Sequence, residues 1–155
     1  MGNYDFNEDL ENESKTINEI VDKLKNSGIE VLKLGHTNHG DIKVRLPKTG
    51  EVAWIEVKED FGKYKGNWTY NVAVEWFSRN KPSGISNDGS KYWIYKIHSE
   101  NGIQYYWFER IEILQLMYDG KYKKTRNGGD KGSNTMMHLY SLPVFTSAGR
   151  EIWNE

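Results

Sequence analysis

Two segments of alternating apolar and polar residues constrain this chain more than any other feature. They are DIKVRL (41–46) and EVAWIEVK (51–58), and the short stretch PKTG separates them. An alternation with a period of two predicts two paired antiparallel strands joined by a turn. If PKTG is the turn, Leu46 faces Glu51, and the same register places Asp41 opposite Glu56.

This register gives the hairpin one apolar face and one charged face. The apolar face carries Ile42, Val44, Leu46, Ala53, Ile55 and Val57. The charged face carries Asp41, Glu56 and Lys58, with the Cβ atoms of the two acids about 4.5–5.5 Å apart. Such facing carboxylates repel each other unless positive charge lies between them. Lys58 could supply it, and Mg²⁺ or Mn²⁺ would be a stronger source because these ions prefer hard oxygen ligands.

An exposed sheet face with an ordinary salt bridge is the alternative interpretation of the same residues. The metal hypothesis also depends on the register, because a slip of one residue would move Asp41 and Glu56 to opposite faces.

The remaining segments predict a mixture of helices and strands. Apolar residues at helical spacing predict a first helix that includes Leu10 and Leu24 and ends at NSG (26–28). Further strands are predicted at 29–34, 70–77, 92–97 and 103–109, and a second helix over 110–120. Residues 35–40 and 61–69 read as loops, the second of them mobile. Residues 79–90 are turn-rich with one helical turn, and the chain then reads as loop-like from 121 to MMHLYSLPVF (136–145).

Composition narrows the class of protein. A chain of 155 residues with 28% charged and 14% aromatic residues is expected to form one folded domain over residues 1–155. It has no cysteine, which excludes disulfides and cysteine-based zinc sites and favours a reducing, cytoplasmic setting. No signal peptide and no apolar run of about 18 residues is present, so we expect a soluble protein without a membrane partner.

Although the net charge is only −1, the chain contains basic segments of the kind that bind a phosphate backbone. One lies within residues 61–98, and a second, predicted to be flexible, covers about 120–134. The candidate nucleic-acid contacts are Lys63, Lys65, Arg79, Lys81, Ser83, Lys123, Lys124 and Arg126. Ordinary solvated lysines and a simple Pro-Gly turn are the alternative.

Three further residues are candidates for the charged site. Glu13 lies on or beside the apolar stripe of the first helix, where negative charge near the N-terminus is favourable in any case. Glu75 could support the site or could simply be the polar side of a strand. His39 faces Lys58 in the predicted register and could assist proton transfer, although hydrogen bonding within its loop explains it as well.

The pattern of Asp41 at the start of one strand and Glu56-Val57-Lys58 near the end of the next resembles the PD-(D/E)XK nuclease superfamily. Glu13 on a preceding helix is similar to the acid often found on the first helix of that family. The resemblance covers roughly residues 8 to 115, and EWFSRNKPSGIS (75–86) also resembles small phage-encoded members. Gly40 stands where the family motif often has proline.

The resemblance implies an α/β (α+β) fold with a restriction-endonuclease-like core, in which helices flank a central mixed sheet of about 4–6 strands. It also implies metal-dependent phosphodiester hydrolysis, with Glu13, Asp41, Glu56 and Lys58 as catalytic residues. Mg²⁺, or Mn²⁺ in its place, would be held by Asp41, Glu56 and the Val57 carbonyl, with help from Glu13. Lys58 would position the attacking water or stabilise the transition state.

The expected function is that of a small DNA endonuclease of phage type, acting in the host cytoplasm. Selectivity for branched DNA, such as a Holliday junction, suits a chain with no room for a sequence-reading domain. Homodimer formation is implied by the resemblance alone. One alternative is a nuclease that acts on single strands or ends with the same site, and RNA is not excluded as substrate. An alternative of another class is a catalytically silent nucleic-acid-binding module.

Overall fold

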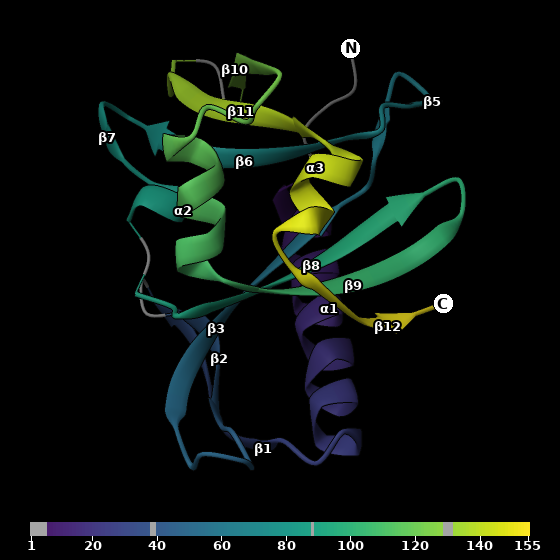
Figure 1. Cartoon of the computed structure of the whole chain (residues 1–155), viewed down its shortest axis with the longest axis vertical. Helices are drawn as coiled ribbons and strands as arrows, with labels where there is room; N and C mark the ends of the chain where they lie inside the picture. The colour runs from purple at the N-terminus through teal and green to yellow at the C-terminus, as the bar shows by residue number, and fades with distance from the viewer. Residues whose placement is uncertain (1–5, 38–39, 88, 129–131) are drawn as a thin grey trace.

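A six-stranded mixed sheet forms the centre of the fold (Figure 1). This computed structural model describes residues 6–37, 40–87, 89–128 and 132–155. The strand order is β1-β2-β3-β8-β9-β12. The bounds are β1 Glu30–Thr37, β2 Gly40–Arg45, β3 Val52–Asp60, β8 Tyr92–Ser99, β9 Gly102–Glu109 and β12 Arg150–Asn154. The expected α/β class with a central mixed sheet is therefore confirmed.

The β2–β3 hairpin has the predicted register. Ile42 pairs with Ile55 and Arg45 with Val52, and the backbone N–H of Leu46 donates to the carbonyl of Glu51 at 2.8 Å. On its other edge β3 pairs in parallel with β8, from Ile55 opposite Tyr92 to Asp60 opposite Ile97. This parallel pair makes the sheet mixed, and it connects the hairpin to the later strands.

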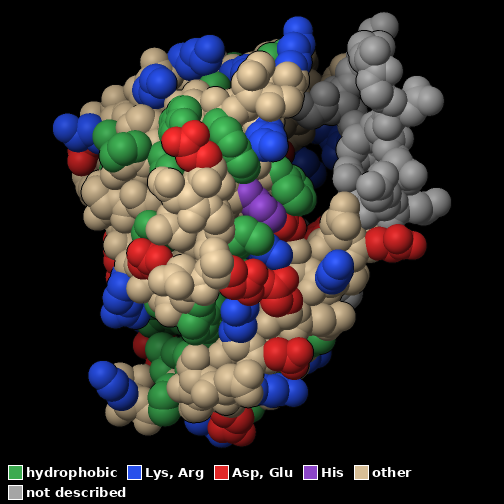
Figure 2. Space-filling view, turned by 90° about the vertical axis from the view of Figure 1, so that its right-hand side faces the viewer, with side chains coloured by type: hydrophobic (Ala, Val, Ile, Leu, Met, Phe, Trp, Pro, Cys, Tyr) green, Lys and Arg blue, Asp and Glu red, His purple; other side chains and the backbone are tan. Residues whose placement is uncertain are grey.

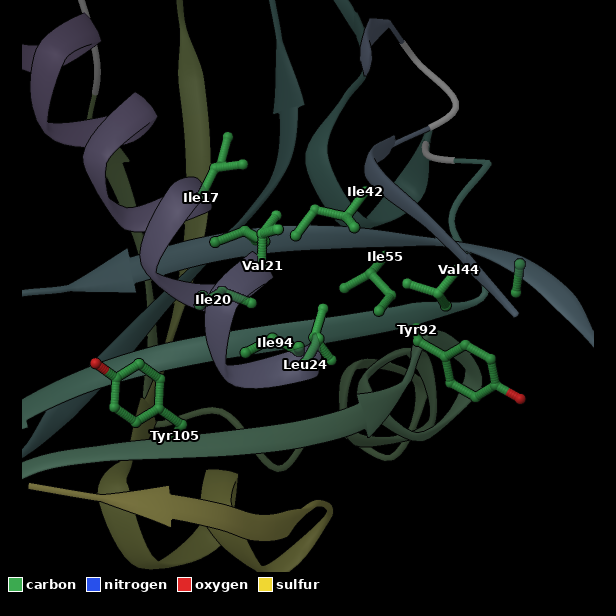
Figure 3. Packing of buried hydrophobic residues seen from close by; sticks show 12 residues of the cluster. Ile17, Ile20, Val21, Leu24, Ile42, Val44, Ile55, Tyr92, Ile94 and Tyr105 are labelled. Carbon is green, nitrogen blue, oxygen red and sulfur yellow. The ribbon is translucent and has the colours of Figure 1, made fainter. Parts of the chain in front are cut away.

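One face of the sheet is covered by helix α1 (Phe6–Asn26). Its apolar stripe meets the apolar face of the hairpin, and Figure 3 shows these side chains pointing toward one another. The labelled members of this core are Ile17, Ile20, Val21, Leu24, Ile42, Val44, Ile55, Tyr92, Ile94 and Tyr105. After α1 the chain turns at Gly28, whose φ of +82° suits glycine.

The other face of the sheet packs against a second layer. This layer contains a four-stranded sheet in the order β10-β11-β6-β7, together with α2, α3 and a short 3-10 helix, η1. The bounds are β6 Asn71–Ser78, β7 Lys81–Pro82, η1 Gly84–Ser86, α2 Arg110–Tyr118, β10 Lys124–Gly128, β11 Thr135–Ser141 and α3 Leu142–Ser147. Trp93, Tyr95, Phe108, Tyr140 and Phe145 fill the core between the layers.

The predicted loop at 61–69 is wrong in part, because it contains a small hairpin of β4 (Lys63–Tyr64) and β5 (Asn67–Trp68). Its two turn residues, Lys65 and Gly66, have φ values of 51° and 79°. Two positive φ values are typical of the turn type that best fits a two-residue hairpin. A second such turn, Arg79-Asn80, joins β6 to β7.

The prediction of a flexible basic segment over 120–134 is also wrong in part. Residues 124–128 form β10, which pairs along its length with β11. Residues 129–131 of that segment lie outside the described part of the chain. The apolar character of β11 could be read from the sequence, but the polar strand KTRNG gives no alternating pattern of its own. No helix of the described residues is long and apolar enough to cross a membrane.

Candidate active site

Asp41 begins the site, at the point where β2 starts. Its side chain is buried, and its Oδ2 accepts a hydrogen bond of 2.8 Å from the backbone N–H of Val57 on β3. Gly40 before it has a φ of +127°, and a Cβ there would overlap Ser90 and crowd Trp54. The departure from proline at this position therefore has a physical cause, because the ring fixes φ near −65°.

The edge of β3 explains why the Val57 N–H meets a side chain. The described pairing of β2 with β3 extends only to Ile42 opposite Ile55, whereas β3 continues to Asp60. At Val57 the Asp41 carboxylate takes the place of a strand partner. A carboxylate so bonded has a fixed direction, which a metal ligand or an electrostatic catalyst requires.

Glu56 and Lys58 lie two residues apart on the same face of β3. Lys58 Nζ is 3.4 Å from Glu56 Oε1 and 5.7 Å from the centre of the Trp93 ring. The Lys58 side chain is 44% exposed and that of Glu56 is 18% exposed. The charged face of the predicted hairpin is therefore half-buried, with its ammonium group reaching solvent.

A groove runs along this edge of β3, between the strand and α1. Its lining residues are Asn12, Glu13, Thr16, Val57, Lys58, Glu59 and Phe61. Glu13 thus lines the same groove as Val57 and Lys58. Figure 2 shows a face of the molecule on which acidic and basic side chains gather beside a histidine.

A second charged cluster lies under α1, and the sequence did not indicate it. Glu59 accepts a hydrogen bond from Thr16 at 2.7 Å, pairs with His98 at 2.6 Å and lies 3.6 Å from Lys96. Lys96 also donates to Glu19 at 2.9 Å. Burial alone would lower the pKa of Lys96, but the hydrogen bond and charge of Glu19 with the charge of Glu59 outweigh it and raise that pKa.

Asp60 is the last charged residue of β3. Its Oδ1 accepts from the Gly62 N–H at 2.9 Å and its Oδ2 accepts from the Ala73 N–H at 3.1 Å. Burial raises the pKa of this carboxyl group in spite of the two hydrogen bonds. Asp60 thus fixes the turn at 60–62 and ties it to β6, a role that no local sequence pattern predicts.

The residues expected to support the site include Glu75, which lies in the second layer of the fold. Glu75 is exposed on β6, in the four-stranded sheet. After burial, the charges of Asp60, Glu56 and Glu75 all help to raise the pKa of Tyr95 well above its usual value, so these carboxylates act on one buried hydroxyl. His39 lies outside the described residues.

The expected nucleic-acid contacts fall into separate places. The Arg126 guanidinium lies 4.7 Å from the Tyr64 ring, which brings β10 beside the β4–β5 hairpin with Lys63 and Lys65. Arg79 and Lys81 are exposed at the β6–β7 turn, and Lys123 and Lys124 are exposed near the start of β10.

Ser83 does not fit its expected role as a phosphate contact. Its hydroxyl oxygen is buried and, among the described residues, has no hydrogen-bond partner. Gly84 beside it does permit a close backbone approach, but to Glu75 of β6. The Pro-Gly stretch therefore packs η1 onto a strand, and Ser83 faces inward.

Comparisons of the chain with protein-family models, curated proteins and solved structures gave no match. The function of this chain must therefore be inferred from the residues and geometry of the site.

Proposed function

We propose that this protein is a Mg²⁺-dependent DNA endonuclease of PD-(D/E)XK type, with a restriction-endonuclease-like core. The hydrogen bond from the Val57 N–H to Asp41 carries the proposal. It holds one carboxylate against the strand that presents Glu56 and Lys58, beside a groove that Glu13 also lines. Acid, acid and lysine are then supported on rigid strands, as a catalytic site requires.

The residues present fit a Mg²⁺ ion. Within the described residues, no group of three or more acidic or histidine side chains is placed so that it could hold a metal ion on its own. Mg²⁺ does not need such a group, because it keeps several waters and is commonly held by one or two carboxylates together with substrate phosphates. Asp41 and Glu56 would hold it with the Val57 carbonyl, and Glu13 lines the same groove. When bound, the ion would lower the pKa of a water and neutralise charge on the phosphate.

The chain's own residues would do the rest. The Val57 N–H keeps the Asp41 carboxylate in one orientation. Glu56 draws the Lys58 ammonium toward the site, and Trp93 lies beneath it. Lys58 would then stabilise the negative charge that develops on the phosphoryl oxygens, a kind of effect worth about 10²–10³ in rate when one donor is removed.

The test is cleavage of four labelled substrates in Mg²⁺: a four-way junction, a flap, a linear duplex and a single strand. We expect the wild-type protein to cut branched DNA, and Lys58→Ala, Asp41→Asn and Glu56→Gln to lose activity. Lys33→Ala, an exposed lysine on β1, is the matched control and should cut normally.

Each of the other possible cleavage results would support a different function. Equal cutting of all four substrates, or cutting of single strands alone, would support the single-strand or end-acting nuclease in place of the junction enzyme. Tight binding without metal-dependent cutting of DNA or RNA would contradict the proposal and favour a silent binding module. Sedimentation of the protein with and without a junction would test the proposed homodimer.

A further inference from the structure

Phe61 is an exposed aromatic ring in the wall of the candidate groove. It follows Lys58 by three residues, lines the groove with Lys58 and Glu13, and is 56% exposed. A single exposed apolar side chain is common on protein surfaces, so the interest of this ring lies in its place beside the charged residues of the groove.

The Phe61 ring is held from one side. It stacks on the His98 ring with centroids 4.9 Å apart and an angle of 27° between planes. His98 in turn is fixed by its 2.6 Å contact with Glu59. One face of Phe61 is therefore occupied by a rigid partner, which leaves the exposed part of the ring for a ligand.

The backbone around Phe61 is equally well fixed. Asp60 bonds the N–H groups of Gly62 and Ala73, and the Gly62 carbonyl accepts from the Thr69 N–H at 2.8 Å. Gly62 has a φ of +71°, and a Cβ at this position would overlap the backbone of His98. The ring is thus placed by a pre-organised turn, which lowers the entropic cost of using it as a binding surface.

The hairpin that begins just after Phe61 is positively charged. Lys63 Nζ lies 4.4 Å from the Trp68 ring, and Arg126 and Lys65 lie 4.7 Å and 5.3 Å from the Tyr64 ring. Basic groups interleaved with aromatic rings are typical of surfaces that bind single-stranded nucleic acid, where bases stack and cations follow the backbone. A ligand with flat apolar rings and a negative backbone matches both features.

We infer that Phe61 stacks on an unpaired base of the nucleic-acid strand, next to the phosphate that the site would cut. The inference rests on the proposed function for the position of the phosphate, and it narrows the substrate class to DNA with unpaired bases at the cut. A base inside an intact duplex cannot offer its face to Phe61 without unstacking, which costs a few kcal/mol. Single-stranded DNA and the unpaired arm of a flap do not carry that cost.

The test compares two labelled strands of equal charge. One is a twelve-nucleotide oligo-dT, and the other is a strand of the same length built wholly from abasic sites. Binding is measured by fluorescence anisotropy in Ca²⁺, with a gel to verify that the strands remain intact. Base stacking on one side chain is worth about tenfold in affinity. The measured quantity is the Kd of the abasic strand divided by the Kd of oligo-dT. We expect this ratio to be about tenfold lower in Phe61→Ala than in the wild type.

Two further variants of Phe61 distinguish stacking of the ring from the size of the side chain. Phe61→Trp should keep the ratio, whereas Phe61→Leu, which retains apolar volume without a π face, should lose it as Phe61→Ala does. Tyr118→Ala, which removes an exposed aromatic on α2, is the matched control and should leave the ratio unchanged. Thermal unfolding of each variant verifies that it is folded.

The outcomes separate the two proposals. An unchanged ratio in Phe61→Ala, or a ratio kept in Phe61→Leu, would overturn the stacking inference even if the protein cuts DNA. Loss of the ratio in a protein that cuts nothing would support stacking while contradicting the nuclease.

Discussion

Two lysines, one on strand β3 and one on its neighbour β8, both have acidic partners but differ in burial and surroundings. Lys58 is 44% exposed and lies 3.4 Å from Glu56. Lys96, on the neighbouring strand β8, is 11% exposed and lies 2.9 Å from Glu19 and 3.6 Å from Glu59. The first borders the groove and the second lies beneath helix α1.

The two lysines differ in burial and in how many partners each has. The Lys96 cluster joins α1 to the sheet through several mutual contacts, among them the hydroxyl of Tyr105 donating to Glu19. Such groups are expensive to disturb because each would leave another charge unpaired in a poorly hydrated place. Lys58 borders a groove, where a partner from solution can reach it. The same residue types therefore predict stability in one place and function in the other.

The largest expected effect is on catalysis. Lys58→Ala should lower the rate of DNA cleavage by at least about 10²-fold, because a preorganised positive charge at the phosphate is lost. Its free energy of unfolding should change by less than about 0.5 kcal/mol, since exposed ion pairs contribute little. Single-turnover cleavage and urea unfolding measure the two. A large loss of stability would remove the contrast with Lys96.

The converse variant is Lys96→Met. Removing the ammonium leaves Glu19 and Glu59 without their buried cation, so we expect a loss of about 3 kcal/mol in the free energy of unfolding. Cleavage by the folded protein should be nearly unchanged when measured well below the unfolding temperature. Adding Glu19→Gln to Lys96→Met should recover part of the stability. Equal losses of activity and stability would show that the two clusters act as one.

Asp60 sharpens the comparison, because it is another charged group of β3 with a different role. Asp60→Asn removes a buried charge but leaves one acceptor oxygen for two N–H donors. We expect a net loss of about 1–2 kcal/mol, since an unsatisfied buried N–H costs about that much. Proteolysis of the β4–β5 hairpin, followed by mass spectrometry, should become faster than in the wild type. A gain in stability would mean that burial of the charge outweighs the two bonds.

Local patterns made part of this site predictable. The alternation of DIKVRL and EVAWIEVK, with a short turn between them, was enough for the register that pairs Ile42 with Ile55. The same pattern placed Glu56 and Lys58 on one face, and a helical stripe placed Glu13 on α1. These relations join residues that are close in the sequence, so local propensity and periodicity are enough to predict them.

The pairing of strands that lie far apart in the chain could not be predicted from the sequence. The cluster of Glu59, Lys96 and His98 depends on the parallel alignment of β3 with β8, which no turn connects. The hairpin turn Lys65-Gly66 was missed because it is not the Asn-Gly or Asp-Gly pair that most often marks such turns, and Arg79-Asn80 was predicted only as part of a turn-rich segment. The Asp60 bond to Ala73 likewise joins segments that only the folded chain brings together.

The smallest expected effect is a pH dependence that belongs to Lys96. Its pKa is raised in the folded protein, with Glu19 and Glu59 holding the proton against the cost of burial. The stabilisation is fully present below the unfolded pKa of about 10.4, and is lost as the pH rises through the higher folded pKa. The difference in free energy of unfolding between wild type and Lys96→Met should therefore narrow as the pH rises above about 10.4 and through the higher folded pKa. Urea titrations of both proteins across this range measure it. A difference that stays constant would mean that the ammonium charge is not what stabilises the cluster, and the distinction from Lys58 would then rest on packing alone.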